Sequence, residues 1–192
     1  CGIKAVEKVA YAKKKGIDFI ICDHHTPDDK LPDAVAVLDP ERNDSTYPFQ
    51  FLSGCGVGFK LLQAYSIRNK LPFEDLKEYL DLLAVSIASD IVPMVNENRI
   101  LAYYGIQKLN KNPRVGIRSI IRAAGIERRL ITIDDIVFKI GPRINAAGRI
   151  ESGKQAVDLL ISEKDEEADL HCERINSHNQ TRRCLLYTSP SP

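Results

Sequence analysis

The sequence lacks any long apolar stretch: no run approaches the roughly 18 consecutive apolar residues that a membrane-spanning helix needs. The first residues also lack the charged, apolar and small-residue blocks of a signal peptide. These absences predict a soluble, cytoplasmic protein with no membrane association. With 192 residues and 44% hydrophobic content, the chain can bury one sizeable core, or one domain and the start of a second.

Cysteine is scarce and scattered. The five cysteines are odd in number and form no CxxC pair, which argues against both a disulfide framework and a zinc knuckle. We therefore expect buried free thiols at Cys1, Cys22, Cys55, Cys172 and Cys184.

A strong net charge is also absent, since acidic and basic residues nearly cancel to +1. The basic residues are unevenly distributed, however: residues 111–149 contain nine basic against three acidic residues. A solvated helical face is one interpretation of this excess, and a nucleic-acid surface is the other. No group of aromatic residues predicts a platform for base stacking.

Neither end of the chain is typical of a complete natural protein. The sequence begins Cys-Gly-Ile without an initiator Met and passes directly into a helical pattern, which predicts a missing upstream part. Residues 184–192 contain two prolines that cannot continue a helix, and they resemble translated sequencing-adapter sequence. We expect this tail to be non-native, with a disordered natural terminus as the alternative.

The order of predicted elements indicates an α/β fold. A first helix should end at Gly16, and two apolar, β-branched runs at 17–22 and 34–38 are typical of buried parallel strands. Helices are then expected near 57–65, 76–88, 98–109, 114–124, 136–140, 154–161 and 166–183, with Thr132 as an N-cap signal. This order fits the C-terminal part of a parallel-sheet domain, followed by a helical extension.

Three titratable side chains, Asp23, His24 and His25, follow the first predicted strand. The carboxyl end of a strand is where an open α/β sheet normally presents its ligand site. Imidazole and carboxylate together suit Mn²⁺ or Mg²⁺ better than a structural zinc, which usually recruits thiolates. A strand end with solvated polar residues is the alternative. Cys22 lies within the strand, so its side chain should point into the core.

A second carboxylate, Asp90, ends the strongly apolar segment 82–89. If it is buried there, an ionised aspartate needs a cation or hydrogen-bond donors to compensate its charge. Metal ligation is one explanation. A carboxylate at a helix C-terminus, held by the backbone or by Arg99, is the other.

Two glycine-containing segments are candidate phosphate-binding sites. Gly54 and Gly56 stand at the start of a predicted helix, where bare N–H groups can approach an anion. The segment 141–149 (GPRINAAGR) predicts a loop in which Arg143, Asn145 and Arg149 can contact a phosphate backbone. Structural capping by the same residues is an equally open interpretation.

Taken in order, these motifs resemble those of the DHH phosphoesterases and, within that family, of exonucleases that digest single-stranded DNA. The similarity covers almost all of residues 1–183. It is carried by Cys1-Gly-Ile3, Gly16-Ile-Asp18, Cys22-Asp-His-His25, Leu31-Pro32, Leu38-Asp-Pro40, Tyr47-Pro48, Ser53-Gly-Cys-Gly-Val57, residues 84–90 with Asn96-Glu-Asn-Arg99, residues 141–149 and residues 176–183.

The resemblance implies a domain organisation. Residues 1–110 would be a DHH catalytic domain without its N-terminal part, and residues 111–162 a basic helical extension containing the GPRINAAGR loop. Residues 163–183 would begin a long helix that connects to a second domain.

The resemblance also implies a two-metal site for Mn²⁺ or Mg²⁺. His24 and Asp90 would ligate one metal, His25 would contact the scissile phosphate or assist proton transfer, and Asp23 would orient the pair. Residues 143, 145 and 149 would hold the DNA backbone. Acidic ligands expected upstream are missing, so the chain alone should bind metal poorly and hydrolyse no DNA.

The implied function is 5′ to 3′ hydrolysis of single-stranded DNA in recombination and repair by a monomeric enzyme. A single-strand-binding protein or a helicase is a candidate partner. Two alternatives remain open: a DHH phosphoesterase acting on oligonucleotides or polyphosphate, and a non-catalytic relative that binds nucleic acid.

Overall fold

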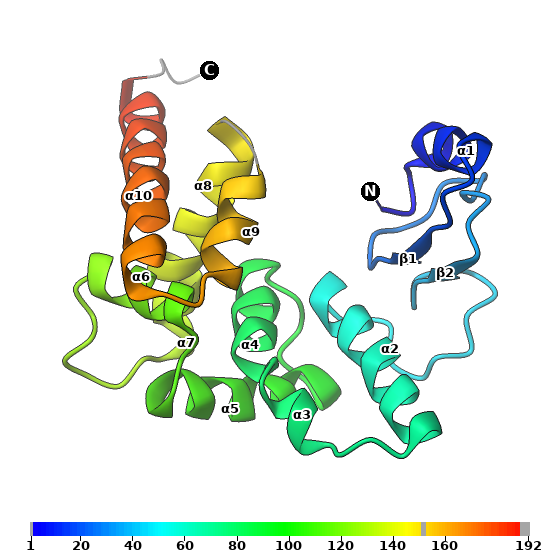
Figure 1. The fold of residues 1–192 in the computed structure, drawn as a ribbon, viewed down its shortest axis with the longest axis horizontal. Coiled ribbons are helices and arrows are strands. Elements are labelled where there is room, and N and C mark those ends of the chain that lie inside the picture. The colour runs from blue at the N-terminus through cyan, green and yellow to red at the C-terminus, as the bar shows by residue number, and fades with distance from the viewer. Residues whose placement is uncertain (1, 151–152, 189–192) are drawn as a thin grey trace. The chain divides into compact units, whose positions relative to one another are not determined.

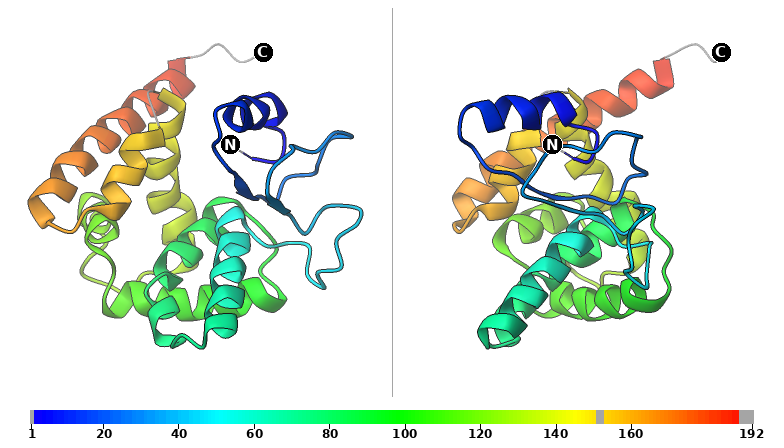
Figure 2. Two further views of the ribbon diagram at one scale, coloured as in Figure 1. Left: turned by 45° about the vertical axis from the view of Figure 1, so that its right-hand side comes forward. Right: turned by 90° about the vertical axis from the view of Figure 1, so that its right-hand side faces the viewer.

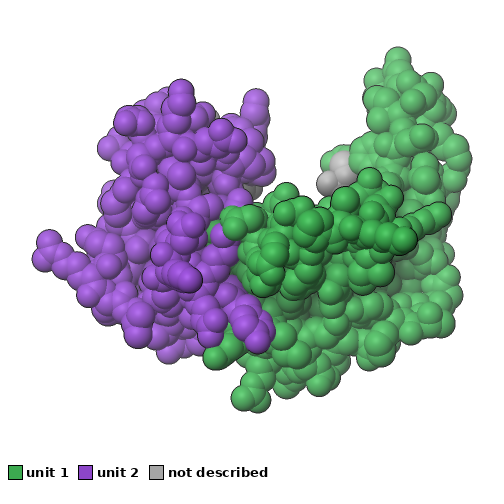
Figure 3. Space-filling model, turned by 60° about the horizontal axis from the view of Figure 1, so that its bottom comes forward, with its two compact units in different colours: residues 1–103 green, residues 104–192 purple. Residues whose placement is uncertain are grey.

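The computed structural model describes residues 2–150 and 153–188, without the side chains of 148–150, 178 and 181–188. The chain divides into two compact units, residues 1–103 and 104–192 (Figure 3). The sequence placed a boundary near residue 110, whereas the two units divide at residue 103, inside one helix. Each unit is described by itself.

Unit 1 combines a two-stranded parallel sheet with helices (Figure 1). The strands pair in parallel with Ile20 opposite Ala36 and Cys22 opposite Leu38, as predicted, but they are only partly buried, since Ile20 is exposed and all of β2 is half-buried. The two strands therefore present their carboxyl ends at the same edge of the sheet. The elements are α1 (Val6–Lys14), β1 (Ile20–Cys22), β2 (Ala36–Leu38), α2 (Gly54–Asn69), α3 (Glu74–Lys77), α4 (Leu80–Ser89) and α5 (Asn96–Lys111), whose last residues belong to unit 2.

Local signals in the sequence explain several of these boundaries. Gly16 follows α1 with a φ of 71°, a conformation that glycine adopts without strain. Ser53 caps α2 by accepting a hydrogen bond from the Gly56 N–H (3.2 Å). The single helix predicted at 76–88 is instead two, because Tyr79 N–H donates to Leu76 O in a tighter turn between α3 and α4.

Two apolar clusters hold unit 1 together. The first cluster joins α2, α3, α4 and α5 through Phe59, Leu76, Leu83, Ile87, Leu101 and Ala102. The second consists of Phe49, Leu52 and Val57, with Cys22, Leu38 and Tyr47 packed against it. Because the second cluster contacts the last residue of each strand and the first turns of α2, it fixes α2 against the carboxyl edge of the sheet.

Unit 2 is helical. Its described elements after α5 are α6 (Val115–Ala123), α7 (Ile133–Asp135), the π-helix η1 (Ile136–Ile140), α8 (Gly141–Ile150), α9 (Gly153–Ile161) and α10 (Asp165–Thr188). The N-cap signal at Thr132 is confirmed, since its N–H donates to Asp135 Oδ2 (3.0 Å) as in a capping box. Helices α6 and α9 cross closely: a Cβ added at Gly116 would lie 1.9 Å from Leu159 O.

Two expectations for unit 2 were wrong. Residues 141–149 form the helix α8 rather than a loop. Pro142 has no N–H to donate, but it lies just after the π-helix η1, where the α-helical hydrogen-bond pattern is already interrupted. The two alanines that follow favour the helical state. The last helix continues through residues 184–188 of the supposed tail, whereas residues 189–192 lie outside the described part.

Acidic partners neutralise much of the basic segment 111–149. Arg118 and Arg122 pair with Asp165, and Arg122 also pairs with Asp169, at the start of α10. Arg129 pairs with Asp135, which lies within 3.1 Å of the Lys139 ammonium as well. These contacts support the interpretation that this part of the basic excess forms a solvated helical face whose charges are paired within the protein.

The cysteines differ from the expectation in one respect. Cys172 is buried and Cys22 half-buried, but Cys55 is exposed. Cys1 and the side chain of Cys184 lie outside the described residues. In the part of the chain that the structure describes, no helix is both long and apolar enough to cross a bilayer.

Candidate metal centre

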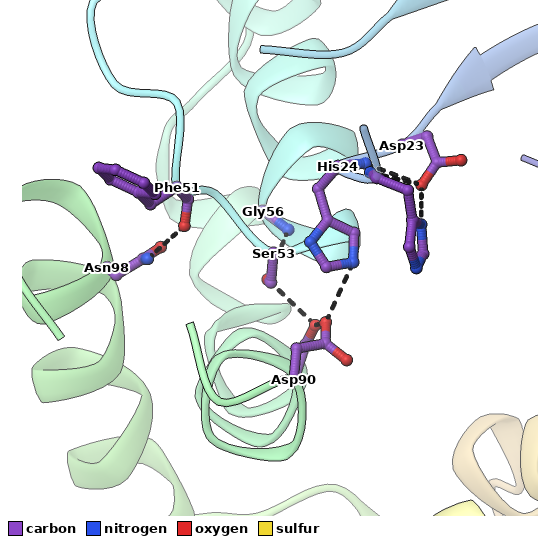
Figure 4. A network of polar contacts seen from close by, with 9 residues as sticks. Asp23, His24, Phe51, Ser53, Gly56, Asp90 and Asn98 are labelled. Carbon is purple, nitrogen blue, oxygen red and sulfur yellow. Dashed lines mark hydrogen bonds and ion pairs between the residues drawn. The ribbon is translucent and has the colours of Figure 1, made fainter. Parts of the chain in front are cut away.

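The predicted metal-ligating side chains of unit 1 lie close together at the carboxyl edge of the sheet (Figure 4). Asp23, His24 and His25 follow β1, and each can offer one ligand atom such that these atoms lie within 4.8 Å of one another. The ring centroids of the two histidines are 4.6 Å apart. The sequence motif is therefore also a cluster in space.

Asp23 is a buried acceptor that organises the turn after β1. Its Oδ2 accepts the Ile3 N–H at 2.6 Å, while Oδ1 accepts the His24 N–H at 2.7 Å and contacts His25 Nδ1 at 2.6 Å. Burial opposes ionisation of this carboxyl, but the hydrogen bonds from Ile3, His25 and His24 outweigh it and lower the pKa to about 2. Asp23 thus stays charged at neutral pH and orients the residues around it.

The contact with Asp23 also fixes the His25 ring. An ionised carboxylate can only accept, so Nδ1 carries the hydrogen of the shared bond and Nε2 of the neutral ring is left as an acceptor or base. The His25 side chain is 68% exposed. It is oriented by Asp23 and remains accessible to a substrate.

His24 faces Asp90, which lies far away in the sequence. Their closest atoms, His24 Nε2 and Asp90 Oδ2, are 3.8 Å apart. That separation is too long for a hydrogen bond. Two atoms that each lie about 2.1 Å from one divalent cation are between about 3 and 4.2 Å apart, so this pair fits a shared cation.

The reason given for Asp90 was wrong, although its position is as predicted. Asp90 is not buried: its side chain is 37% exposed at the C-terminal end of α4. The negative end of a helix dipole disfavours a carboxylate there. A nearby cation would compensate this unfavourable effect. Ser86 Oγ donates a hydrogen bond to Asp90 Oδ2 (3.3 Å), whereas the sequence suggested Arg99 or the backbone as the partner.

The glycines at the start of α2 serve the packing of this site. A Cβ on Gly54 would lie 3.3 Å from His24 Cδ2, so glycine allows the helix to approach the imidazole. The Gly56 N–H is already donated to Ser53. Contact of Gly54 and Gly56 with a substrate anion stays a prediction. Gly2 is even closer to Asp23, because a Cβ there would lie 2.2 Å from Oδ2.

Sequence reasoning missed Asp39 at this edge. Asp39 follows β2 as Asp23 follows β1, and only 6% of it is exposed. Burial raises the pKa of its carboxyl, the nearby Asp23 raises it further, and His24 lowers it. Its Oδ2 has no partner among the described residues. The rule that singled out Asp23, a polar residue at the end of a buried strand, also applies to Asp39.

The predicted phosphate contacts lie in unit 2. Arg143 donates from Nε to Asn176 Oδ1 (3.1 Å) and from Nη1 to Lys139 O (2.6 Å), contacts that support the structural interpretation of this residue. Asn145 is exposed, and the Arg149 side chain lies outside the described residues. The structure thus brings together the residues of unit 1 and leaves these three as a separate prediction.

Comparisons with known proteins show what the whole chain is similar to. Residues 1–87 match the model of the DHH family, N-terminal domain. The chain is 39% identical over 185 residues to the single-stranded-DNA-specific exonuclease RecJ of Bacillus subtilis, an alignment that covers 96% of this chain and 23% of that protein. The corresponding Escherichia coli RecJ is 33% identical over 192 residues, which cover 95% of this chain and 33% of that protein.

Solved structures show the same relationship. The crystal structure of Thermus thermophilus RecJ in complex with Mn²⁺ superposes with a TM-score of 0.81 at 31% identity, over 96% of this chain and 27% of that one. The same protein in complex with Mg²⁺ gives 0.72 at 30% identity, over 88% and 25%. The chain therefore spans about a quarter to a third of these relatives. By sequence and by fold the chain is similar to RecJ over nearly its whole length, and its residues 1–87 match the DHH family.

Proposed function

We propose that this chain carries part of the active site of a metal-dependent exonuclease that hydrolyses phosphodiester bonds in single-stranded DNA. The observation that carries the proposal is the 3.8 Å separation of His24 Nε2 and Asp90 Oδ2 at the carboxyl edge of a parallel sheet. Support comes from relatives named as single-stranded-DNA-specific exonucleases, one of them solved with Mn²⁺ and with Mg²⁺.

The donor set fits a hard divalent cation. His24 and Asp90 would hold Mn²⁺ or Mg²⁺, which in a two-metal site supplies positive charge to the attacking and leaving oxygens at phosphorus. Asp23 holds the His25 ring through Nδ1. The exposed Nε2 of His25 would then contact the scissile phosphate or move a proton at the reacting oxygen.

The remaining roles belong to the same proposal. Arg143, Asn145 and Arg149 would contact the DNA backbone, with Arg143 leaving some of its present partners to do so. From the similarity to these relatives we also propose 5′ to 3′ hydrolysis and a part in recombination and repair. A cytoplasmic location and a single-strand-binding or helicase partner belong to the same proposal. Since the chain spans only part of these relatives, we expect it alone to release no nucleotides.

The test is a nuclease assay on a full-length protein that contains this chain. A long 5′-phosphorylated single strand should be degraded with Mn²⁺ faster than a dinucleotide, and His24→Ala should abolish hydrolysis while sparing DNA binding. A preference for the dinucleotide would indicate a small-substrate phosphoesterase. An unchanged rate in His24→Ala would remove the catalytic assignment, and DNA binding without any hydrolysis would indicate a non-catalytic relative.

A further inference from the structure

Two serine hydroxyls connect the first turn of α2 with the metal-ligand candidate at the end of α4 (Figure 4). Ser53 Oγ accepts the Gly56 N–H at 3.2 Å. Ser53 Oγ and Ser86 Oγ are 3.0 Å apart, and Ser86 Oγ lies 3.3 Å from Asp90 Oδ2. The contacts form a continuous series from a helix N-terminus to a carboxylate.

The chemistry of the groups sets the direction of this series. Each hydroxyl has one hydrogen, and an ionised carboxylate can only accept. A charged acceptor makes the stronger bond, so the Ser86 hydrogen goes to Asp90 and the Ser53 hydrogen to Ser86 Oγ. Gly56, Ser53 and Ser86 then donate in sequence, and bonds arranged in this way polarise one another.

Burial and spacing make the series an orienting device. Ser53 is fully buried, so water does not compete for its bonds. Ser86 precedes Asp90 by one helical turn and lies on the same face of α4. Asp90 itself is 37% exposed at a helix end. Without the Ser86 contact, its side chain would be free to turn away from the imidazole.

A second contact holds the backbone on both sides of the series. Asn98 is fully buried, and its Nδ2 donates to Phe51 O (2.6 Å) and Pro93 O (3.0 Å). These carbonyls lie just before Ser53 and just after Asp90. Between them, Ile91 has a φ of 55°, so the turn that leaves Asp90 needs such support.

We propose that Ser53 and Ser86 are positioning residues of the metal centre, which aim Asp90 Oδ2 at His24 Nε2. The proposal rests on the proposed function for the nature of the cation, but the hydrogen-bonded series itself exists without metal. It acts through Asp90, so its removal should weaken metal binding only where that carboxylate is present.

The test uses the isotope-labelled chain and NMR. Mn²⁺ broadens nearby amide signals even when it binds weakly, so the loss of the His24 and Gly54 signals during titration measures relative affinity. Ser86→Ala should reduce the affinity roughly 10-fold, and Ser86→Thr, which keeps the hydroxyl, should restore it. Ser89→Ala is the matched control, because Ser89 lies on the same helix and its hydroxyl has no partner among the described residues.

Two further measurements separate positioning from a general structural effect. In an Asp90→Ala background, Ser86→Ala should cause no additional loss of affinity. Without metal, Ser86→Ala should shift the side-chain carboxyl ¹³C signal of Asp90, and Ser89→Ala should not. An unmoved carboxyl signal together with unchanged Mn²⁺ affinity in Ser86→Ala would overturn the proposal. If the unmodified chain shows no broadening at His24, the chain by itself binds Mn²⁺ too weakly for the titration, and an unmoved carboxyl signal in Ser86→Ala then suffices to overturn the proposal.

Discussion

The most informative perturbation of unit 1 is Asp23→Asn. The carboxylate accepts the Ile3 and His24 N–H groups and the His25 ring, and only 9% of its side chain is exposed. An asparagine keeps the shape but turns an NH₂ group toward one of these donors. The substitution therefore removes the charge and leaves at least one buried donor without an acceptor.

The lowered pKa gives the size and the sign of the effect. A fall from the ordinary 3.8 to about 2 corresponds to about 2 kcal/mol of stability at pH 7. Because the folded-state pKa is lowered, this stability is fully present above pH 5 and is lost as the pH falls through the folded value. Roughly half should be gone at pH 3.

Urea unfolding between pH 7 and pH 3 tests this account. Amide signals of β1 and α2 should be followed by NMR, so that unit 1 is observed separately from unit 2. The difference in unfolding free energy between the unmodified chain and Asp23→Asn should be about 2 kcal/mol at pH 7 and shrink toward pH 3. Asp33→Asn is the control, since its pair with Lys13 is exposed and should contribute little. A difference that does not depend on pH would refute the reasoning.

Four further substitutions test the packing around the site and in unit 2. Asn98→Ala removes two hydrogen bonds from a fully buried side chain and should lower the free energy of unfolding of unit 1 in urea by about 2 kcal/mol. A change near zero would show that the bonds to Phe51 O and Pro93 O do not hold the backbone. Gly116→Ala pushes a methyl group against Leu159 O and should lower the stability of unit 2 by about 2 kcal/mol or more. Gly58→Ala, with open space around its Cβ, should instead stabilise α2 by up to about 1 kcal/mol. Equal effects of Gly116→Ala and Gly58→Ala on stability would rule out the close approach of α6 to α9. Asp135→Asn should destabilise unit 2 by about 2 kcal/mol at pH 7, because ion pairing and hydrogen bonding hold the pKa of this carboxyl well below its usual range; retention of full stability would show that these contacts contribute nothing.

Local chemistry explains what was predictable. The β-branched runs before Asp23 and Asp39 predicted the two strands, and Gly16 and Thr132 predicted helix boundaries. Each of these signals acts within a few residues of itself. The prediction for segment 141–149 was wrong because glycine and proline are typical of loops, whereas here they continue a helical run that begins at Ile133.

The sequence by itself determined that an Asp-His-His cluster stands at the end of a strand, because strand propensity and residue order are local properties. It named Asp90 through a possible burial that the structure does not show, and through the family resemblance. Tertiary structure decided that Asp90 Oδ2 lies 3.8 Å from His24 Nε2, that Asp39 is buried at the same edge of the sheet, and that Ser53 and Ser86 connect α2 with α4. These facts depend on how distant segments pack, and residue patterns along the chain do not report such contacts.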